Sequence, residues 1–405
     1  MLDTVVLILD RRHFQILQPE RFSPSAKGLL VPPYYPLGSR GNFACVQNPT
    51  KADLQGDRYL PRLTLAKRKI PSGFALTLRI EFSAPKLVFG NNFDELESRD
   101  FGKVLVALHR GLAHMGVGVS TDALRQARVS AIHYSKNIVF IDYTTCSMVM
   151  SELELIDLNS RLDLSHTDYR DNGHATRYHA NSFEVTFYDK LKDLDKARYS
   201  QKRTIEQDHG TQLEMFGNRD SFPKQLEVLR IEARLGTRAK ITNLLKRVGA
   251  SAEPTFEALF NADIAKSVLE HFWGNVRARL PLSYRSDRLR PEDLLAALAY
   301  SAKGTVRLSK LLQQLACAIL IASVGVRGAS AALSRHCSPR SWQRYKRELR
   351  RLPVHEAGAF RALKQVDQAL SRFEPLHMKS FHTAREDSVA GRSRSKRGSG
   401  ARWNT

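Results

Sequence analysis

The chain has few cysteines, and they are not spaced as metal ligands. Its four cysteines, Cys45, Cys146, Cys317 and Cys337, are scattered without the C-x-x-C spacing of a zinc ribbon. The number and spacing also argue against a disulfide framework and favour a reducing compartment. We therefore expect neither a small zinc module nor a secreted fold stabilised by disulfides.

Long hydrophobic runs are lacking too. The longest, LACAILIASVGV at residues 315–326, is well short of the roughly 20 residues that span a bilayer. The first twelve residues, MLDTVVLILDRR, lack the basic start and the cleavage site of a signal peptide, so they predict a strand. We expect a soluble cytoplasmic protein with no membrane partner. The GxxxxGK[ST] phosphate loop is absent, which argues against a built-in helicase.

Basic residues, by contrast, are abundant. Lys and Arg number 63 against 41 Asp and Glu, giving a net charge of +22. A surface of this charge attracts polyanions, and nucleic acid is the first partner to consider. The 405 residues are 42% hydrophobic, which describes a folded protein of two or three domains, not a basic arm.

The hydrophobic pattern changes along the chain. Up to about residue 240, segments of alternating apolar and polar residues predict strands, with one helix over 101–117. Beyond about residue 245 only helical spacing occurs. The sequence predicts an α+β fold: a largely antiparallel sheet domain over 1–245, a mainly helical domain over 246–383, and a disordered basic tail over 384–405.

Four predicted strands, at residues 77–83, 160–165, 183–188 and 228–235, each have one apolar and one polar face. A solvated face is the ordinary interpretation for any one of them. If the four strands share one sheet, however, their polar residues converge, and Tyr188 stands at the rim. The polar faces carry Arg79, Glu81, Arg161, Asp163, Glu184, Tyr188, Arg230, Glu232 and Arg234.

That convergence predicts a metal site beside a nucleophile. Glu81, Asp163 and Glu232 would supply oxygen ligands to Mg²⁺ or Mn²⁺. A tyrosine hydroxyl, whose pKa is near 10, needs a cation to attack a phosphodiester at neutral pH. The metal and either Lys190 or Lys192 would supply that charge. The interleaved arginines, Arg161, Arg230 and Arg234, would contact DNA phosphates, as would Lys192.

The chain resembles the filamentous-phage gene II replication proteins, which initiate rolling-circle replication. The similarity runs through RIEFSAPKLVFGNN (79–92), SRLDLS (160–165), FYDK (187–190) and LRIEARLGTR (229–238), with a looser counterpart at 337–352. It implies that Tyr188 is the nicking nucleophile and Lys190 its companion. The implied substrate is supercoiled double-stranded origin DNA and its single strand in the cytoplasm of a bacterial host, with a host helicase and polymerase as partners.

The chain departs from the His-hydrophobic-His pair that holds the metal in many other rolling-circle initiators. His174 and His179 are five residues apart and His133 stands alone, so we leave all three out of the metal set. Tyr134, Tyr169 and Tyr199 are rivals to Tyr188 as the nucleophile.

The segment SPRSWQRYKRELRRL predicts a basic helix that starts with Ser338 as N-cap and Pro339 as its first residue. Arg340 and Arg344 on its surface would bind DNA, although a merely solvated basic face fits this pattern equally well.

Two other functions fit the same residues. In one, the protein binds and regulates an origin without catalysis, and Tyr188 only packs at a strand end. In the other, the protein is a mobilisation relaxase that performs the same nicking chemistry.

Overall fold

A computed structural model describes most of the strand-rich part of the chain and several of the later helices. The described residues are 1–24, 42–50, 53, 59–140, 144–154, 168–170, 175–199, 227–250, 253–278, 292, 295–296, 298–299, 307–333, 336–349 and 361–377. The expected tail at 384–405 lies outside them.

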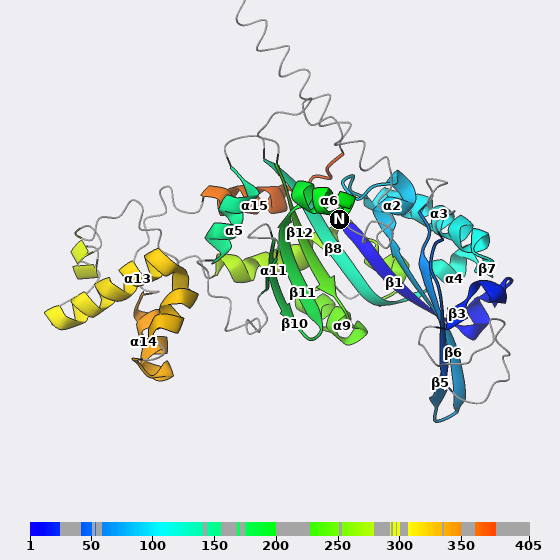
Figure 1. Cartoon of the computed structure of the whole chain (residues 1–405), viewed down its shortest axis with the longest axis horizontal. Coiled ribbons are helices and arrows are strands. Elements are labelled where there is room, and N and C mark those ends of the chain that lie inside the picture. Colours follow the sequence, from blue (N-terminus) through cyan, green and yellow to red (C-terminus); the bar gives the residue numbers. More distant parts are fainter. Residues whose placement is uncertain are drawn as a thin grey trace, which may run out of the picture.

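The centre of the fold is one large antiparallel sheet of ten strands, in the order β3-β4-β5-β6-β1-β8-β12-β11-β10-β9 (Figure 1). All nine neighbouring pairs are antiparallel. The strands are β1 (Leu2–Asp10), β3 (Ser23–Pro24), β4 (Phe43–Gln47), β5 (Arg62–Ile70), β6 (Gly73–Ser83), β8 (Arg128–Phe140), β9 (Asp168–Arg170), β10 (Ala175–Ala180), β11 (Phe183–Asp189) and β12 (Glu227–Leu235). A separate two-stranded sheet pairs β2 (Gln15–Ile16) with β7 (Val117–Gly118).

Helices account for most of the remaining described structure, so the fold is α+β, as the sequence predicts. They are α2 (Ala84–Phe89), α3 (Phe101–His114), α4 (Thr121–Arg125), α5 (Cys146–Glu154), α6 (Lys190–Tyr199), α9 (Arg238–Arg247), α10 (Phe256–Leu259), α11 (Ala262–Arg277), α13 (Leu308–Leu333), α14 (Pro339–Leu349) and α15 (Arg361–Arg372), with short 3-10 turns at Arg11–His13, Pro19–Arg21 and Ser98–Asp100.

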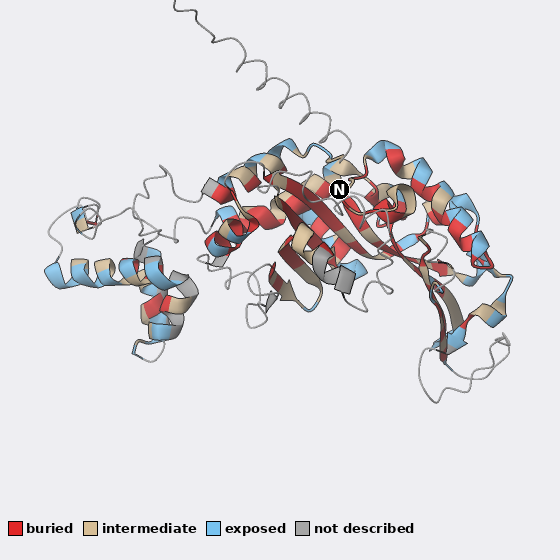
Figure 2. Ribbon diagram, turned by 45° about the horizontal axis from the view of Figure 1, so that its top comes forward, coloured by how far each residue is buried: buried red, intermediate tan, exposed pale blue. Residues whose placement is uncertain are grey.

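The alternation of apolar residues determines which face of the sheet meets the helices. Leu78, Ile80 and Phe82 of β6 are buried, as are Leu229 and Ile231 of β12. Buried and half-buried segments of the strands accordingly run through the middle of the molecule in Figure 2. The polar residues between these positions therefore lie on the opposite face, as expected from a period of two.

The hydrophobic core does not divide at residue 245, where we expected a domain boundary. Phe272 of α11 stacks on Phe183 of β11, with ring centroids 5.3 Å apart, and Trp273 lies 6.3 Å from Phe187. Leu363 of α15 is buried in the same cluster. These helices follow the last strand in sequence, but they cover the sheet because its apolar face needs them.

A second, smaller hydrophobic cluster joins α13 and α14, with Ile321 and Trp342 among its buried residues. Ser338 Oγ accepts a hydrogen bond from the Ser341 amide at 3.2 Å, so the predicted N-cap of α14 is confirmed. None of the helices in the described ranges is long and apolar enough to cross a membrane.

The helix α6 follows β11 directly and continues to Tyr199. Asp189 stabilises the start of α6, because its Oδ1 accepts hydrogen bonds from the amides of Leu191 and Lys192 at 3.0 and 3.1 Å. The chain therefore turns directly from β11 into a helix just after Tyr188.

Candidate active site

A polar pocket of about 430 Å³ opens at the end of β11. Its walls come from strands that are far apart in sequence, namely β1, β5, β6, β8, β10, β11 and β12, and from the first turn of α6. Its ionisable lining residues include Asp3, Arg62, Glu81, His133, Arg177, Glu184, Tyr188, Lys190, Lys192, Glu232 and Arg234. The pocket thus unites three of the four predicted polar strand faces.

Tyr188 reaches into this pocket from the penultimate position of β11. Its side chain is half-buried, and its hydroxyl donates a long hydrogen bond of 3.4 Å to Oε2 of Glu232 on the neighbouring β12. Burial raises the pKa of the Tyr188 phenol well above its usual value; Arg230 opposes the shift and Glu232 adds to it. The resting hydroxyl is therefore protonated at neutral pH.

Glu232 is the centre of the charge network. It is 2% exposed, and its Oε1 lies 2.9 Å from Arg234 Nε and 3.1 Å from His133 Nδ1. Burial alone would raise the pKa of this carboxyl, but Arg234 and the His133 hydrogen bond together hold it well below its usual range. Glu232 is therefore an anion that tethers an arginine, a histidine and the tyrosine.

Glu184 extends the network along β11. Its carboxylate lies 3.1 Å from Arg177 of β10 and 3.1 Å from Arg234 of β12. Thr186 donates to it at 3.0 Å. The sequence placed Glu184 on the polar face, but we assigned it no role, because only the pairing of β10, β11 and β12 brings it to both arginines.

Arg230, which we expected to contact DNA, is instead a buried cation beneath the site. It is 1% exposed, and it forms a 3.0 Å ion pair with Asp3 and donates to the Asn92 carbonyl and to Ser135 Oγ. A side chain enclosed in this way does not reach a phosphate. Its role is structural and electrostatic, and Asp3 is the partner that the sequence did not reveal.

The two lysines after Tyr188 line the pocket in different ways. Lys190 is 4% exposed, with its Nζ 5.7 Å from the centre of the Tyr188 ring and 3.1 Å from Asp193. The Lys192 side chain is 42% exposed, and its Nζ lies 3.6 Å from Asp189. Lys192 is thus the more accessible of the two to an incoming phosphate.

Two of the three expected metal ligands reach this pocket. Glu81 is partly exposed and paired with Arg79 at 2.7 Å, while Glu232 is paired with Arg234. Their oxygen chemistry suits Mg²⁺, but a cation would have to compete with those arginines. Asp163 and Arg161 lie outside the described residues, so the structure does not place them.

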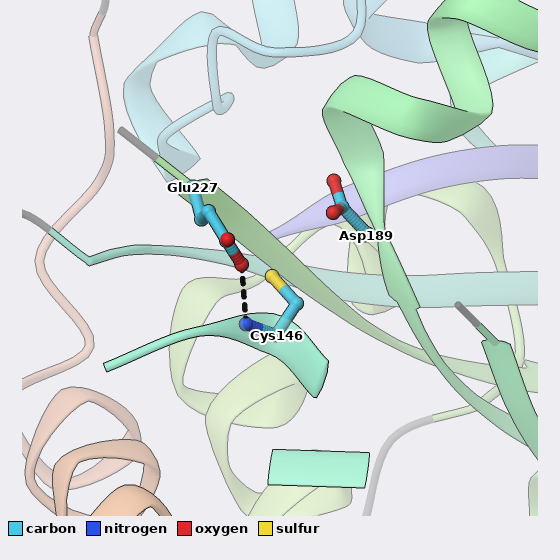
Figure 3. A group of neighbouring side chains, drawn as sticks. All are labelled: Cys146, Asp189 and Glu227. Carbon is cyan, nitrogen blue, oxygen red and sulfur yellow. Dashed lines mark hydrogen bonds between the residues drawn. The ribbon is translucent and has the colours of Figure 1, made fainter. Parts of the chain in front are cut away.

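A different cluster has the closest set of metal-ligand atoms. Within the described ranges, the one group of three that lies within 4.8 Å comprises Cys146, Asp189 and Glu227 (Figure 3). A thiolate favours zinc over magnesium. Burial, together with the two carboxylates, raises the pKa of the Cys146 thiol. Asp189 caps α6, and Glu227 accepts a hydrogen bond from the Cys146 amide. These contacts account for the closeness of the three side chains without a bound ion.

Comparison with protein-family models, curated proteins and solved structures found no match. The geometry of the pocket is therefore the basis for any functional conclusion.

The rival tyrosines differ in what the structure says of them. Tyr134 is 1% exposed and donates to the Leu259 carbonyl at 3.0 Å, which excludes it as an accessible nucleophile. The side chains of Tyr169 and Tyr199 lie outside the described part. Arg340 and Arg344 are exposed on α14, a helix of the second cluster, and neither lines the pocket.

His133 is the functional candidate that sequence reasoning passed over. It looked isolated in the sequence, yet the pairing of β8 with β12 sets it directly opposite Arg234 and beside Glu232. The alternation of β8, with Ile132 and Tyr134 buried on either side of it, was the available signal that His133 points to the polar face.

Proposed function

We propose that this protein nicks and rejoins one strand of DNA at a replication origin, through a covalent link to Tyr188, and so initiates rolling-circle replication. The observation that carries the proposal is the Tyr188 hydroxyl, hydrogen-bonded to a carboxylate inside a pocket lined by lysines and arginines. The resemblance to phage initiators supports the same role for Tyr188.

The proposed step is a transesterification. The Tyr188 oxygen attacks the phosphorus of a phosphodiester, the bond from phosphorus to the 3′ oxygen breaks, and a 5′-phosphotyrosine forms. The phenol loses its proton as this bond forms, and the released 3′ oxygen takes up a proton to become the 3′ hydroxyl, so the step conserves protons. One phosphodiester replaces another, so the reverse attack by a 3′ hydroxyl rejoins DNA without ATP.

Positive charge is the other requirement of this step. The raised pKa of Tyr188 means that the phenolate must be stabilised as it forms. Arg230 supplies a fixed charge that favours it, and Lys192 and Arg234 are partly exposed cations at the pocket wall for the phosphate.

The proposed step also uses Mg²⁺, which would neutralise the negative charge of the phosphate. Glu81 and Glu232 would hold it, with Asp163 as the third proposed ligand. Separation of the strands falls to a host helicase and synthesis to a host polymerase, while Arg340 and Arg344 of α14 would contact the DNA backbone.

The test uses a supercoiled plasmid that carries the element's origin, incubated with the protein and Mg²⁺. We expect the wild-type protein to convert it to the nicked form and to become covalently attached to DNA. A Tyr188→Phe protein should do neither, because only the attacking oxygen is removed.

Tyr345→Phe is the matched control, since Tyr345 packs against the second hydrophobic cluster, its hydroxyl donates to Gln313 of α13, and it does not line the pocket. A Tyr188→Phe protein that still attached to DNA would remove the proposed nucleophile. If the wild type did not nick the plasmid, and its affinity for the origin changed neither with Mg²⁺ nor with Tyr188→Phe, the result would favour the non-catalytic regulator instead.

A further inference from the structure

Among the described residues, the hairpin of β5 and β6 extends past the two strands that flank it. β4 pairs with β5 only as far as Lys67, and β1 pairs with β6 only as far as Thr77. Residues 68–76 therefore form a two-stranded ribbon, which projects below the rest of the sheet in Figure 1. Residues 67–74 are called the hairpin tip below.

The chain carries charge of one sign from residue 58 to residue 80, which covers most of this hairpin. Between Asp57 and Glu81 there is no acidic residue at all. The same segment has six basic residues, namely Arg58, Arg62, Lys67, Arg68, Lys69 and Arg79. A projecting element rich in positive charge is complementary to a polyanion.

Apolar side chains are exposed among these cations. Phe74 is 47% exposed and Ile70 is 39% exposed. Lys69 is the cross-strand partner of Phe74, and Lys67 Nζ lies 4.5 Å from the centre of the Phe74 ring. Lysines alone would be explained as protection of a sheet edge against aggregation. An exposed phenylalanine and isoleucine beside them work against that purpose, so protection does not account for the tip.

The same two strands also line the active-site pocket. Arg62 and Glu81 are cross-strand partners at the other end of the hairpin, and both line the pocket. Lys69 lies seven positions along β5 from Arg62, a span of roughly 23 Å. Arg62 and Arg68 share one face of β5, because their positions differ by an even number, whereas Lys69 and its partner Phe74 lie on the other face. A strand of DNA that leaves the pocket along the Arg62 face thus meets Arg68, and it reaches Phe74 by crossing the end of the narrow two-stranded ribbon.

We propose that the hairpin tip is a second DNA contact, outside the pocket, which takes a single strand by stacking a base on Phe74 and placing phosphates beside Arg68 and Lys69. This contact is separate from the nicking chemistry. It rests on the proposed function in one respect, namely that the polymer bound is DNA. A single strand fits better than a duplex, because an aromatic side chain stacks on an unpaired base.

The experiment measures the anisotropy of a short labelled oligothymidylate with the full chain in a Tyr188→Phe background, without divalent cations. Phe74→Ala should weaken binding roughly 5- to 150-fold, the range for loss of one stacked base. Phe74→Trp should retain affinity, whereas Phe74→Leu should behave like Phe74→Ala. Val106→Ala, at a 45% exposed position on α3, is the control and should bind normally.

The phosphate contacts have their own readout. Replacing both Arg68 and Lys69 by serine should lower the slope of log Kd against log salt by about 1.4, since each contact to a single strand contributes about 0.7. The Arg99→Ser protein, changed at a 77% exposed arginine, should keep the wild-type slope.

Unchanged affinity of Phe74→Ala for the single strand would overturn the proposal, as would an equal loss for Phe74→Leu and Phe74→Trp. A loss seen only with duplex DNA would assign the tip to duplex binding and would also overturn it. Because no chemistry takes place in this assay, its outcome is independent of origin nicking: Phe74-dependent binding can persist where Tyr188-dependent nicking fails, and the reverse.

Discussion

Tyr188 and Glu232 meet in an arrangement that would keep the proposed nucleophile at rest until substrate arrives. The tyrosine hydroxyl donates to a carboxylate that is already occupied by Arg234 and His133. Both pKa values move away from neutrality, that of the phenol upward and that of the carboxyl downward. The pair therefore does not exchange its proton at rest, and the proposed attack would require a cation or a phosphate to favour the phenolate.

The charge on Glu232 should be visible in the pH dependence of stability. A carboxyl whose pKa is lowered by folding stabilises the protein above its unfolded pKa of about 4.3, and that contribution is lost as the pH falls through the folded value. At pH 7 we expect Glu232→Gln to lower the free energy of unfolding by roughly 1–3 kcal/mol, less than a fully buried pair because Arg234 is partly exposed.

Urea unfolding of the wild type and Glu232→Gln at neutral pH and below about pH 4 measures this difference, which should shrink on acidification. Glu257→Gln is the control, since its ion pair with Arg125 is exposed and worth about 0.5 kcal/mol or less. A Glu232→Gln difference that stayed constant down to strongly acid pH would contradict the ionised, paired state of Glu232.

At the scale of elements, the junction of β11 and α6 positions the site. β11 is anchored by Val185 and Phe187 in the core, and Asp189 ends the strand by capping α6. The first turn of that helix then directs Lys190 and Lys192 to the pocket. The run of charged residues after Tyr188 is thus a helix start that carries the site lysines.

Removing the cap should weaken this junction. Asp189→Ala should cost about 1 kcal/mol in the free energy of unfolding, as for other N-caps, while Asp189→Asn should cost only a few tenths because asparagine caps equally well. Chemical denaturation of the two variants makes the comparison. Equal losses for Ala and Asn would show that the negative charge, not the cap, is what the junction requires.

At the scale of the whole molecule, two hydrophobic clusters are interleaved in sequence. The sheet core includes residues of α9, α10, α11 and α15. The helices α13 and α14, which lie between α11 and α15 in the sequence, belong to the second cluster. Trp273 of α11 donates to Asp367 of α15 at 2.8 Å, which joins the two helices across that insertion. The sheet core thus depends on residues from both ends of the helical region.

Two shortened chains test this arrangement. A chain in which a Gly/Ser linker replaces residues 279–360 should keep a cooperative unfolding transition, because it retains α11 and α15. A chain that stops at residue 245 should not, because it lacks Phe272 and Trp273, which cover Phe183 and Phe187, and loss of one buried aromatic side chain costs about 3–5 kcal/mol. Circular dichroism during urea unfolding compares them. Cooperative unfolding of the shorter chain would restore the boundary expected at 245.

The sequence by itself determined the local features. Its alternation identified the core faces of β6, β11 and β12, and its turn and cap chemistry located the start of α14, because these depend on neighbouring residues only. It also marked Tyr188, Glu81 and Glu232 as polar residues on strand faces that a shared sheet would bring together.

Only the tertiary structure decided which of these residues meet. In the sheet, β1 and β8 lie between β6 and β12, so the pocket extends across four strands from Glu81 to Glu232. The pairing of β8 with β12 places His133 beside Glu232. Simple alternation would place Asp3 on the core side of β1 together with Val5. The pairing of β1 with β8 shifts register between Leu2 and Val5, and Asp3 lines the pocket. Burial of Arg230 and the shared core of α11 and α15 are equally non-local, because they arise from pairing and packing between segments that lie far apart in the chain.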